Sequence, residues 1–346
     1  MSDPIRHPWA EPPAAGEAIE IAPGALWMRL PLPMKLDHVN VYAFDDGNSW
    51  TVVDTGFDSA RGRAAWQVLL EGPLAGRAVR RVVATHHHPD HIGLAGWFMD
   101  RGGAELWTTR TAWLTARMLV LDEQAAPPPE TISFWRVAGM PSDMLAARAL
   151  ERPFNFTDMV HPLPLGYSRI EQGAVIGFGG RLWDVHIGHG HAPEHATFWS
   201  QQDDLVIGGD QLLPGISPNL GVYPTEPGAD PVGEWQDSCG RFAELAEDRH
   251  LILPGHQLPY TGLPTRMAQL FENHLTALDR LREALAQTPM TAVDCFPVLF
   301  RRVIGPGEYG LALAESVAHL NCLARSGLIR RAGLSDHGGV LWRAVA

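Results

Sequence analysis

The first 260 residues alternate between short apolar runs rich in β-branched residues and longer segments with a helical spacing of apolar positions. Short apolar runs predict strands, and a spacing of three to four residues predicts helices. The predicted strands cover residues 27–32, 39–44, 50–56, 82–83, 174–178, 181–187, 204–210 and 250–256. The predicted helices cover residues 60–70 and 234–247. Strands and helices that alternate in this way favour a layered α/β protein.

Two further segments have a more helical pattern. Between residues 107 and 165, helices are expected over 111–121 and 142–150, and methionine and aromatic residues are frequent. Two interpretations of this segment stay open: ordinary core packing, or an apolar lid over a substrate pocket. In the tail, helices are expected over 263–272, 274–287, 291–303 and 308–326, followed by two strands around a turn at 335–339. Helices followed by a hairpin indicate a small winged-helix module.

Five of the predicted strands end in polar residues, namely Asp54, the cluster His86–His91, the cluster His189–His195, Asp210 and His256. Functional sites of layered α/β proteins gather at the carboxyl ends of strands. The cluster after residue 85 has the spacing His-x-His-x-Asp-His, and imidazole and carboxylate are groups that bind zinc where thiolates are absent. The alternative is a solvated loop that is rich in histidine by chance and chelates metal weakly. Because residues of the ligand type recur at distant strand ends, we favour a metal site.

Composition restricts the setting of this site. With 346 residues, 45% of them hydrophobic and 19% charged, the chain is typical of a globular protein with room for one large and one smaller domain. The net charge of −12 argues against a surface that coats nucleic acid. Cys239, Cys295 and Cys322 are far apart, which predicts reduced structural thiols. Because the N-terminus has no signal-sequence pattern and no apolar run is long enough to cross a bilayer, we expect a cytoplasmic protein without a membrane partner.

Five motifs follow one another over roughly residues 25–260: Val53-Asp-Thr-Gly56, Thr85-His-His-His-Pro-Asp-His91, Gly190-His-Ala-Pro-Glu-His195, Gly208-Gly-Asp210 and Pro254-Gly-His256. In this order they resemble the motifs of the metallo-β-lactamase superfamily of hydrolases. The resemblance implies an α/β fold in the form of a four-layer αββα sandwich. With the helical tail added, we expect a flexible arm at 1–22, a catalytic domain at 23–262 with a helical lid at 107–165, and a C-terminal helical or winged-helix domain at 263–346.

The resemblance also implies a centre with two metal ions. Seven residues would bind them: His86, His88 and His191 the first ion, Asp90, His91 and His256 the second, and Asp210 both. Two zinc ions are the expected cofactors. Iron and manganese are alternatives, because ligand type alone does not separate these metals.

Other residues of the motifs are expected to support the centre without binding metal. Asp54 would orient the histidine loop, and His87 occupies a variable position of its motif. His189 and His195 flank His191, and each would have a supporting or structural role. The replacement of His191 by His189 as a ligand is an alternative.

The implied ligand set predicts hydrolysis by a metal-bound hydroxide. Two cations that share a water lower its pKa toward about 7, and the hydroxide then attacks a carbonyl or phosphoryl centre. Asp90 would be the catalytic residue that orients this water and takes up its proton. The resemblance associates Asp210 with thioesterases, lactonases and nucleases, since antibiotic-degrading members have no bridging aspartate. A homoserine-type lactonase is expected to have a tyrosine shortly after this aspartate, and the run Gln211–Leu213 weakens that branch.

The leading hypothesis is a dinuclear metal-dependent hydrolase of a small-molecule acyl substrate, that is a thioester, ester or lactone of small or medium size. The second is a metal-dependent endoribonuclease, because residues 318–329 resemble the C-terminal domain of a β-lactamase-like subgroup that includes an endoribonuclease. Arginines of the tail would then guide single-stranded RNA: Arg301, Arg302, Arg325, Arg330, Arg331 and Arg343. We favour a packing or dimerisation module, which would make the protein a homodimer, because the acidic body attracts a phosphate backbone weakly. A non-catalytic binding protein on the same fold and a sulfur-oxidising iron enzyme are the remaining alternatives.

Overall fold

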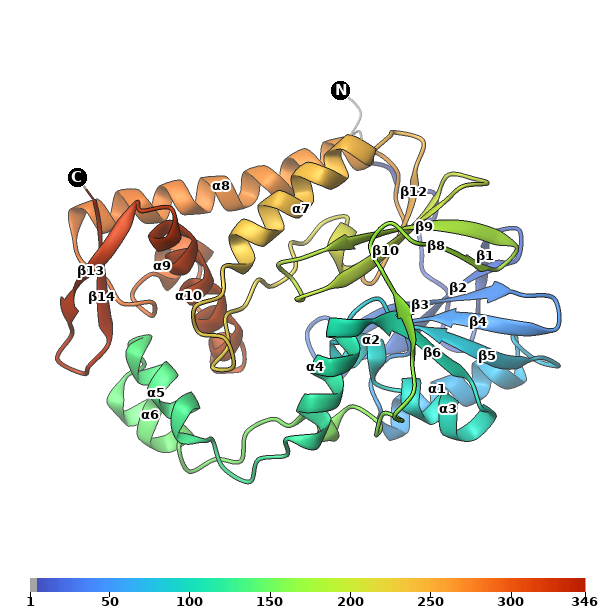
Figure 1. Ribbon diagram of the computed structural model, residues 1–346, viewed down its shortest axis with the longest axis horizontal. Helices are drawn as coiled ribbons and strands as arrows, with labels where there is room; N and C mark the ends of the chain where they lie inside the picture. Colours follow the sequence, from blue (N-terminus) through green and yellow to red (C-terminus); the bar gives the residue numbers. More distant parts are fainter. Residues whose placement is uncertain (1–4, 346) are drawn as a thin grey trace.

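Two β-sheets packed face to face form the centre of the structure, a computed structural model that describes residues 5–345 (Figure 1). The strands of the first sheet lie in chain order: β1 (Ile19–Ala22), β2 (Ala25–Pro31), β3 (His38–Asp45), β4 (Ser49–Val53), β5 (Ala78–Val83), β6 (Glu105–Thr109) and β7 (Ser168–Ile170). Strands β1 to β4 pair antiparallel. Strands β4 to β7 pair parallel, so their carboxyl ends meet at one edge of the sheet.

The second sheet has the order β12-β11-β10-β9-β8. Its strands are β8 (Val175–Phe178), β9 (Arg181–Gly188), β10 (His195–Ser200), β11 (Leu205–Gly209) and β12 (Leu251–Pro254). Strands β8 to β11 pair antiparallel, and β11 pairs parallel with β12. Strands β6, β7 and β10 were not expected from the sequence; β7 has only three residues, and β10 begins inside the predicted polar cluster at His195.

Helices cover the outer face of each sheet, and aromatic residues fill the space between the sheets. Trp27, Phe44, Trp183 and Phe198 belong to the core cluster between the sheets. Helices α1 (Ala60–Glu71), α3 (Ala95–Gly102) and α4 (Arg110–Leu121) pack on the first sheet, and α7 (Pro231–Leu245) and α8 (Leu263–Gln287) on the second. The four-layer αββα sandwich implied by the sequence is confirmed.

The described part of the N-terminal segment is attached to the body, and this corrects the expectation of a loose arm at residues 1–22. Residues 1–4 lie outside the described residues. The backbones of Arg6 and Thr261 exchange hydrogen bonds of 3.2 and 2.9 Å. Trp9 packs edge-on against Trp27 at 6.3 Å between ring centroids, and Ile19 pairs with Trp27 in the sheet. The sequence signal is weak because this strand has only four residues, one of them Glu20.

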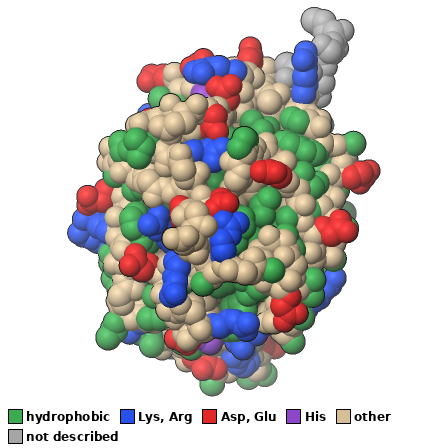
Figure 2. Space-filling view, turned by 90° about the vertical axis from the view of Figure 1, so that its right-hand side faces the viewer, with side chains coloured by type: hydrophobic (Ala, Val, Ile, Leu, Met, Phe, Trp, Pro, Cys, Tyr) green, Lys and Arg blue, Asp and Glu red, His purple; other side chains and the backbone are tan. Residues whose placement is uncertain are grey.

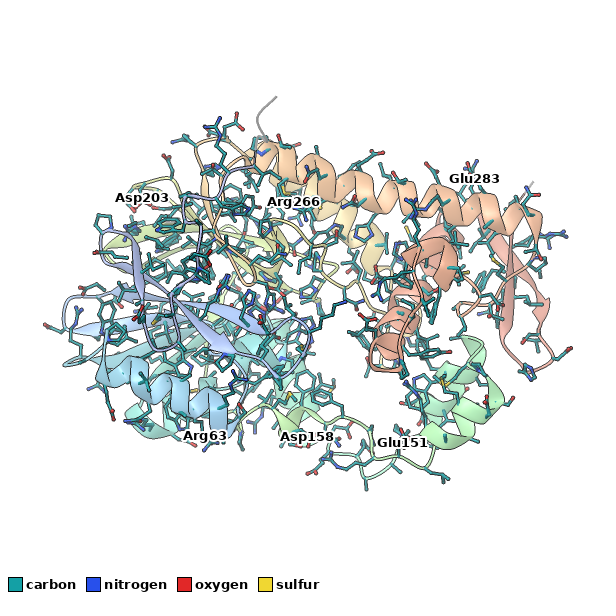
Figure 3. All side chains as sticks on the ribbon, turned by 180° about the vertical axis from the view of Figure 1, so that it is seen from behind. Arg63, Glu151, Asp158, Asp203, Arg266 and Glu283 are labelled. Atoms are coloured by element: carbon teal, nitrogen blue, oxygen red, sulfur yellow. The ribbon has the colours of Figure 1, made fainter. Side chains whose placement is uncertain are left out.

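The segment between residues 107 and 165 divides into two parts. Helix α4 packs on the first sheet, and η1 (Phe156–Asp158) lies against the histidine loop, where Phe156 stacks on His87. Helices α5 (Pro129–Val137) and α6 (Ser142–Arg148) instead pack on the C-terminal part of the chain, with Ala138 and Met140 in its core cluster. The connection that returns from α6, which contains Glu151 and Asp158, runs along the lower edge of the molecule (Figure 3). Of the segment expected to form a lid, α5 and α6 pack on the C-terminal part, and only η1 is seen against the histidine loop.

The C-terminal part consists of helices followed by a hairpin, as the sequence predicted. Helix α8 is one continuous helix of 25 residues where two were expected, because its buried stripe continues from Leu270 past Asn273 to His274 and Ala277. The expected helix at 291–303 is limited to α9 (Phe296–Phe300), which ends at Arg301 with a positive φ of 53°. Then follow η3 (Pro306–Glu308), α10 (Tyr309–Arg325), and the hairpin of β13 (Ile329–Leu334) and β14 (Val340–Ala344).

The surface mixes charges of both signs. On the face shown in Figure 2, Lys and Arg side chains lie among Asp and Glu side chains. Across residues 5–345, no helix has the length and apolar character that a membrane span requires. The three cysteines are free and buried, and burial raises the pKa of each thiol to about 12, in agreement with a structural role.

Candidate metal centre

The carboxyl ends of β4, β5, β9, β11 and β12 bring the five polar motifs together between the two sheets. After β5 the chain turns into the short helix α2 (Pro89–Ile92), whose first turn is fixed by Pro89. Gly93 ends this helix, and a side chain there would overlap the backbone carbonyl oxygens of Gly56 and Pro89. The loop is therefore packed against the end of β4 with no space for a larger residue.

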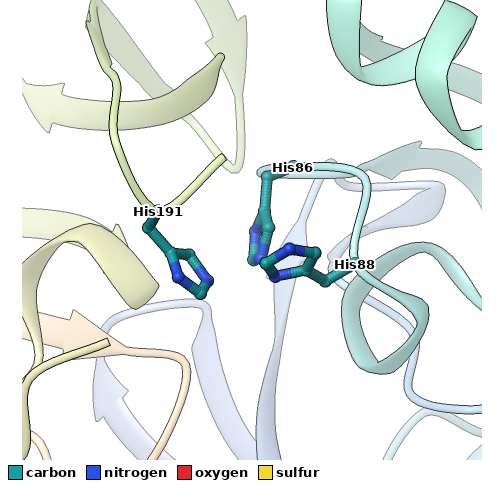
Figure 4. Close-up of side chains that lie close together, drawn as sticks. All are labelled: His86, His88 and His191. Atoms are coloured by element: carbon teal, nitrogen blue, oxygen red, sulfur yellow. The ribbon is translucent and has the colours of Figure 1, made fainter. Parts of the chain in front are cut away.

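His86, His88 and His191 form the first group of candidate ligands (Figure 4). His86 and His88 project from the loop after β5, and His191 projects toward them from the loop after β9. His86 Nε2 lies 3.0 Å from His88 Nδ1, and the ring centroids of His88 and His191 are 4.5 Å apart. Each residue offers a ring nitrogen, and these three atoms lie within 4.8 Å of one another.

Asp90, His91 and His256 form the second group, with the same limit of 4.8 Å between the offered atoms. His256 Nε2 lies 3.3 Å from Asp90 Oδ2, and His91 Nε2 lies 3.6 Å from the same oxygen. Two loops that are far apart in the chain thus contribute to one cluster.

Asp210 lies between the two groups. Its Oδ2 is 3.4 Å from His191 Nε2 in the first group and 3.3 Å from His256 Nε2 in the second. Its Oδ1 is 3.4 Å from His91 Nε2. This is the position that the resemblance implies for a ligand of both ions.

Four of the five candidate histidine ligands have their other ring nitrogen held by a protein oxygen. Each of these Nδ1–H groups donates to one acceptor: His86 to Thr85 Oγ1 (3.0 Å), His91 to Asp54 Oδ2 (2.7 Å), His191 to the Asn219 carbonyl (2.9 Å) and His256 to the His38 carbonyl (2.8 Å). Such bonds fix the tautomer and the ring orientation, and they leave Nε2 available as a metal ligand.

Asp54 organises the histidine loop. Its carboxylate is buried and accepts hydrogen bonds from the Thr85 backbone N–H at 2.8 Å, from Thr85 Oγ1 at 2.9 Å and from His91 Nδ1 at 2.7 Å. Its φ is +59°, in the left-handed region that non-glycine residues rarely adopt. Residues held in such a conformation cluster at functional sites. The geometry agrees with the orienting role expected from the sequence.

The charges of the centre are strongly coupled. Burial alone would lower the pKa of His91, but Asp210, Asp90 and Asp54 outweigh it and raise this pKa well above its usual value. Burial would raise the pKa of Asp210, but His256 and His91 lower it well below the ordinary range. Burial and the neighbouring histidines lower the pKa of His86. At pH 7 the Asp210 carboxylate is therefore ionised, as a metal ligand must be.

The residues present fit metal ions. Within the described part of the chain, His91 Nε2, His191 Nε2 and Asp210 Oδ1 are buried and have no hydrogen-bond partner, although such atoms are normally satisfied. All three belong to the clusters above. A set of imidazoles and carboxylates suits zinc, and also iron and manganese.

Three further histidines of the motifs lie outside these clusters. His87 is buried and stacks parallel to Phe156, with 6.2 Å between the ring centroids. His189 turns away from the centre and lines a cavity of 190 Å³ together with Arg169 and Arg241. His191 and not His189 meets His86 and His88, so the alternative ligand is not supported. His195 is buried, stacks on His86 at 4.5 Å and accepts a hydrogen bond from the Asp210 backbone N–H.

Comparison with known proteins agrees with this geometry. The family model of the metallo-beta-lactamase superfamily matches residues 34–284, which is more than half of the chain. The chain belongs to the metallo-beta-lactamase superfamily. The model of the metallo-beta-lactamase-like C-terminal domain matches residues 278–342. This superfamily member is accordingly a metal-dependent hydrolase.

Three relatives show how far the similarity extends. The crystal structure of a beta-lactamase domain protein from Burkholderia ambifaria is 35% identical, has a TM-score of 0.88 and covers 99% of this chain and 97% of its own. A metallo-beta-lactamase family protein from Thermus thermophilus is 26% identical, with a TM-score of 0.79, and 94% of this chain and 100% of that chain are covered. The Bacillus subtilis protein named "Probable metallo-hydrolase YqjP" is 27% identical over 300 residues, which are 86% of this chain and 91% of that protein. The similarity therefore includes both the sandwich and the C-terminal part.

Proposed function

We propose that this superfamily member is a dinuclear metal hydrolase whose substrate is a small or medium acyl compound: a thioester, an ester or a lactone. The position of Asp210 is the observation that carries the proposal. A single carboxylate within 3.4 Å of candidate ligands of both groups can join two ions into one reaction centre. His86, His88 and His191 would hold one ion and Asp90, His91 and His256 the other.

Two divalent cations, when bound, supply a water of lowered pKa and polarise the substrate oxygen. Asp90 is the group of this chain that would handle the proton. It is partly buried, and its Oδ2 faces His256 Nε2 and His91 Nε2. Burial would raise its pKa, but His91 and His256 lower it below the usual value, so the carboxylate is present at pH 7 and can accept the proton.

Exposed apolar residues on helix α4 favour an acyl substrate. Helix α4 begins beside the loop of His191, where the Thr111 backbone N–H donates to Glu194 Oε2 at 3.1 Å. Leu114, Met118 and Leu121 of this helix are exposed and recur at intervals of four and three residues, on one side of the helix. Each methylene of a substrate that such residues remove from water contributes about 0.8 kcal/mol, or about fourfold in KM.

The substrate class is tested with a panel of thioesters, esters and lactones of increasing acyl length, a phosphodiester and a single-stranded RNA, all with the zinc-loaded full chain. We expect turnover of at least one acyl class and a KM that falls as the acyl chain lengthens. Turnover of the phosphodiester or the RNA alone would refute the acyl proposal.

The role of Asp90 is tested with Asp90→Asn, and Asp100→Asn provides the matched control because Asp100 is an exposed aspartate whose carboxylate contacts His161. Loss of a general base is expected to lower kcat by about 10²–10⁴-fold. The control is expected to retain wild-type kcat. Wild-type kcat in metal-loaded Asp90→Asn would contradict the assigned role.

A further inference from the structure

Residues 213–223, the first part of the loop between η2 (Asp210–Leu212) and α7, connect the candidate metal centre to the C-terminal helices. On one side, the Asn219 carbonyl accepts the hydrogen bond from His191 Nδ1 at 2.9 Å. On the other side, Asn219 Nδ2 donates to Glu315 Oε2 in α10 at 2.7 Å. One residue thus contacts a candidate ligand with its backbone and the C-terminal part with its side chain.

The rest of this loop is held by the same helices. The Val222 backbone N–H donates to the Ala314 carbonyl at 3.1 Å. Arg266, which is 4% exposed, lies in the part of α8 above the two sheets (Figure 3). Its Nε donates to the Leu213 carbonyl at 2.6 Å and its Nη2 to the Ile216 carbonyl at 2.7 Å. The conformation of the loop therefore depends on α8 and α10.

Glu315 has features of a group that positions another residue. It is partly buried, and among the described residues no arginine or lysine forms an ion pair with it. Burial raises its pKa to about 7, and the hydrogen bond from Asn219 acts in the opposite direction. A carboxyl group that is partly buried without a cationic partner lowers the stability of the fold. A packing contact alone therefore does not explain why residue 315 is a glutamate.

We propose that Glu315 is a positioning residue of the metal centre. It orients Asn219, whose carbonyl holds His191 in the tautomer and the ring orientation that direct Nε2 at the first metal position. Without the Glu315 bond, Asn219 Nδ2 keeps only the longer hydrogen bond of 3.4 Å to the Leu311 carbonyl, so the Asn219 carbonyl is held less firmly as the acceptor of His191 Nδ1–H. This inference rests on the proposed role of His191 as a ligand, and it makes the C-terminal part of the chain a component of the metal centre.

The test measures the zinc affinity of the full chain by competition with a chromophoric chelator, for the wild type, Glu315→Ala, Asn219→Ala and the double variant. Each single variant is expected to bind one zinc ion about 10–100-fold more weakly, as when a group that supports a metal ligand is lost. The double variant is expected to be no weaker than either single variant, because both changes remove the same bond. Glu315→Gln keeps a side-chain oxygen for Asn219 and is expected to restore affinity.

The matched control is Arg148→Ala. Arg148 of α6 lies 5.2 Å from the ring centroid of Tyr309, at the first residue of α10. This variant removes a contact of the same helix that does not involve Asn219. Its melting temperature is expected to fall while zinc affinity stays at the wild-type value.

Glu315→Ala with a lowered melting temperature and wild-type zinc affinity would overturn the proposal, since the contact would then act only between the domains. If Glu315→Ala does not fold, Asn219→Ala decides the question, and unchanged affinity in that variant overturns the proposal equally. A wild-type chain that binds no zinc would overturn the proposed function itself. That failure is visible before any variant is made.

Discussion

Gly255 permits the close approach of two candidate ligands, and Gly255→Ala is expected to weaken metal binding. A methyl group at this position would overlap Asp210 Oδ1 and lie 2.8 Å from His91 Cε1, whereas ordinary contact begins at 3.4 Å. The backbone has no freedom to retreat, because its N–H donates to the Gly209 carbonyl at 2.9 Å and its carbonyl accepts from the Asn40 N–H at 2.7 Å. The side chains of Asp210 and His91 must therefore move.

The required displacement is large on the scale of metal coordination. Asp210 must shift by about 1 Å, whereas metal–ligand distances hold to within about 0.2 Å. Overpacking of this kind costs about 1–3 kcal/mol. In the metal-free chain, Asp210 can move away and relieve the overlap. Metal binding requires Asp210 to return to its position, so the energetic cost of the overlap lowers the metal affinity. Affinity is expected to fall about 5- to 150-fold.

The assay is competition for zinc with a chromophoric chelator, together with thermal unfolding of the metal-free protein. Gly240→Ala is the matched control. Gly240 lies within α7, and a methyl group there has nothing within 4 Å. The control is expected to bind zinc as the wild type does and to gain up to about 1 kcal/mol of stability. Wild-type affinity for both ions in Gly255→Ala would refute the positions assigned to Asp210 and His91.

Two further predictions follow from the same geometry. In Asp54→Asn, asparagine tolerates the left-handed backbone but presents an amide instead of a carboxylate to the three donors. Zinc affinity is therefore expected to fall about 10–100-fold. Unchanged affinity in the chelator assay would contradict the orienting role of Asp54. Replacement of Arg301, Arg302, Arg330 and Arg331 by Ala is expected to leave acyl turnover unchanged, because Arg302 already pairs with Glu308 and Arg331 lies over Trp342. Micromolar RNA binding by the wild type, with a steep salt dependence that the quadruple variant loses, would favour the ribonuclease alternative.

The sequence predicted the parts of the fold and the centre that depend on local pattern. The sequence predicted the strand ends that carry the candidate site, because apolar runs stop at Asp54, the histidine loop, Asp210 and His256. The resemblance implied His191 as the ligand with His189 as the alternative, and in the structure His191 groups with His86 and His88. Both lie in one loop two residues apart, and only the course of the chain after β9 decides which ring meets His86.

The supporting contacts could not be predicted from residue type. Asn219 and His38 hold His191 and His256 through backbone carbonyls, which every residue has. The division of the segment 107–165 also depends on distant packing, since α5 begins at Pro129, the third of three consecutive prolines, and is stabilised by the C-terminal part. The Ala138 carbonyl, for example, accepts from the Val293 N–H at 3.1 Å. Such contacts between distant segments leave no periodic signal in the sequence.

The central claim is that seven residues hold two metal ions in one centre. Anomalous diffraction from crystals of the zinc-loaded full chain, combined with elemental analysis of the same preparation, tests it most directly. The account predicts two zinc ions per chain. One should be bound by His86, His88 and His191, the other by Asp90, His91 and His256, and Asp210 should contact both. One ion or fewer per chain, or zinc bound away from Asp210, would contradict it.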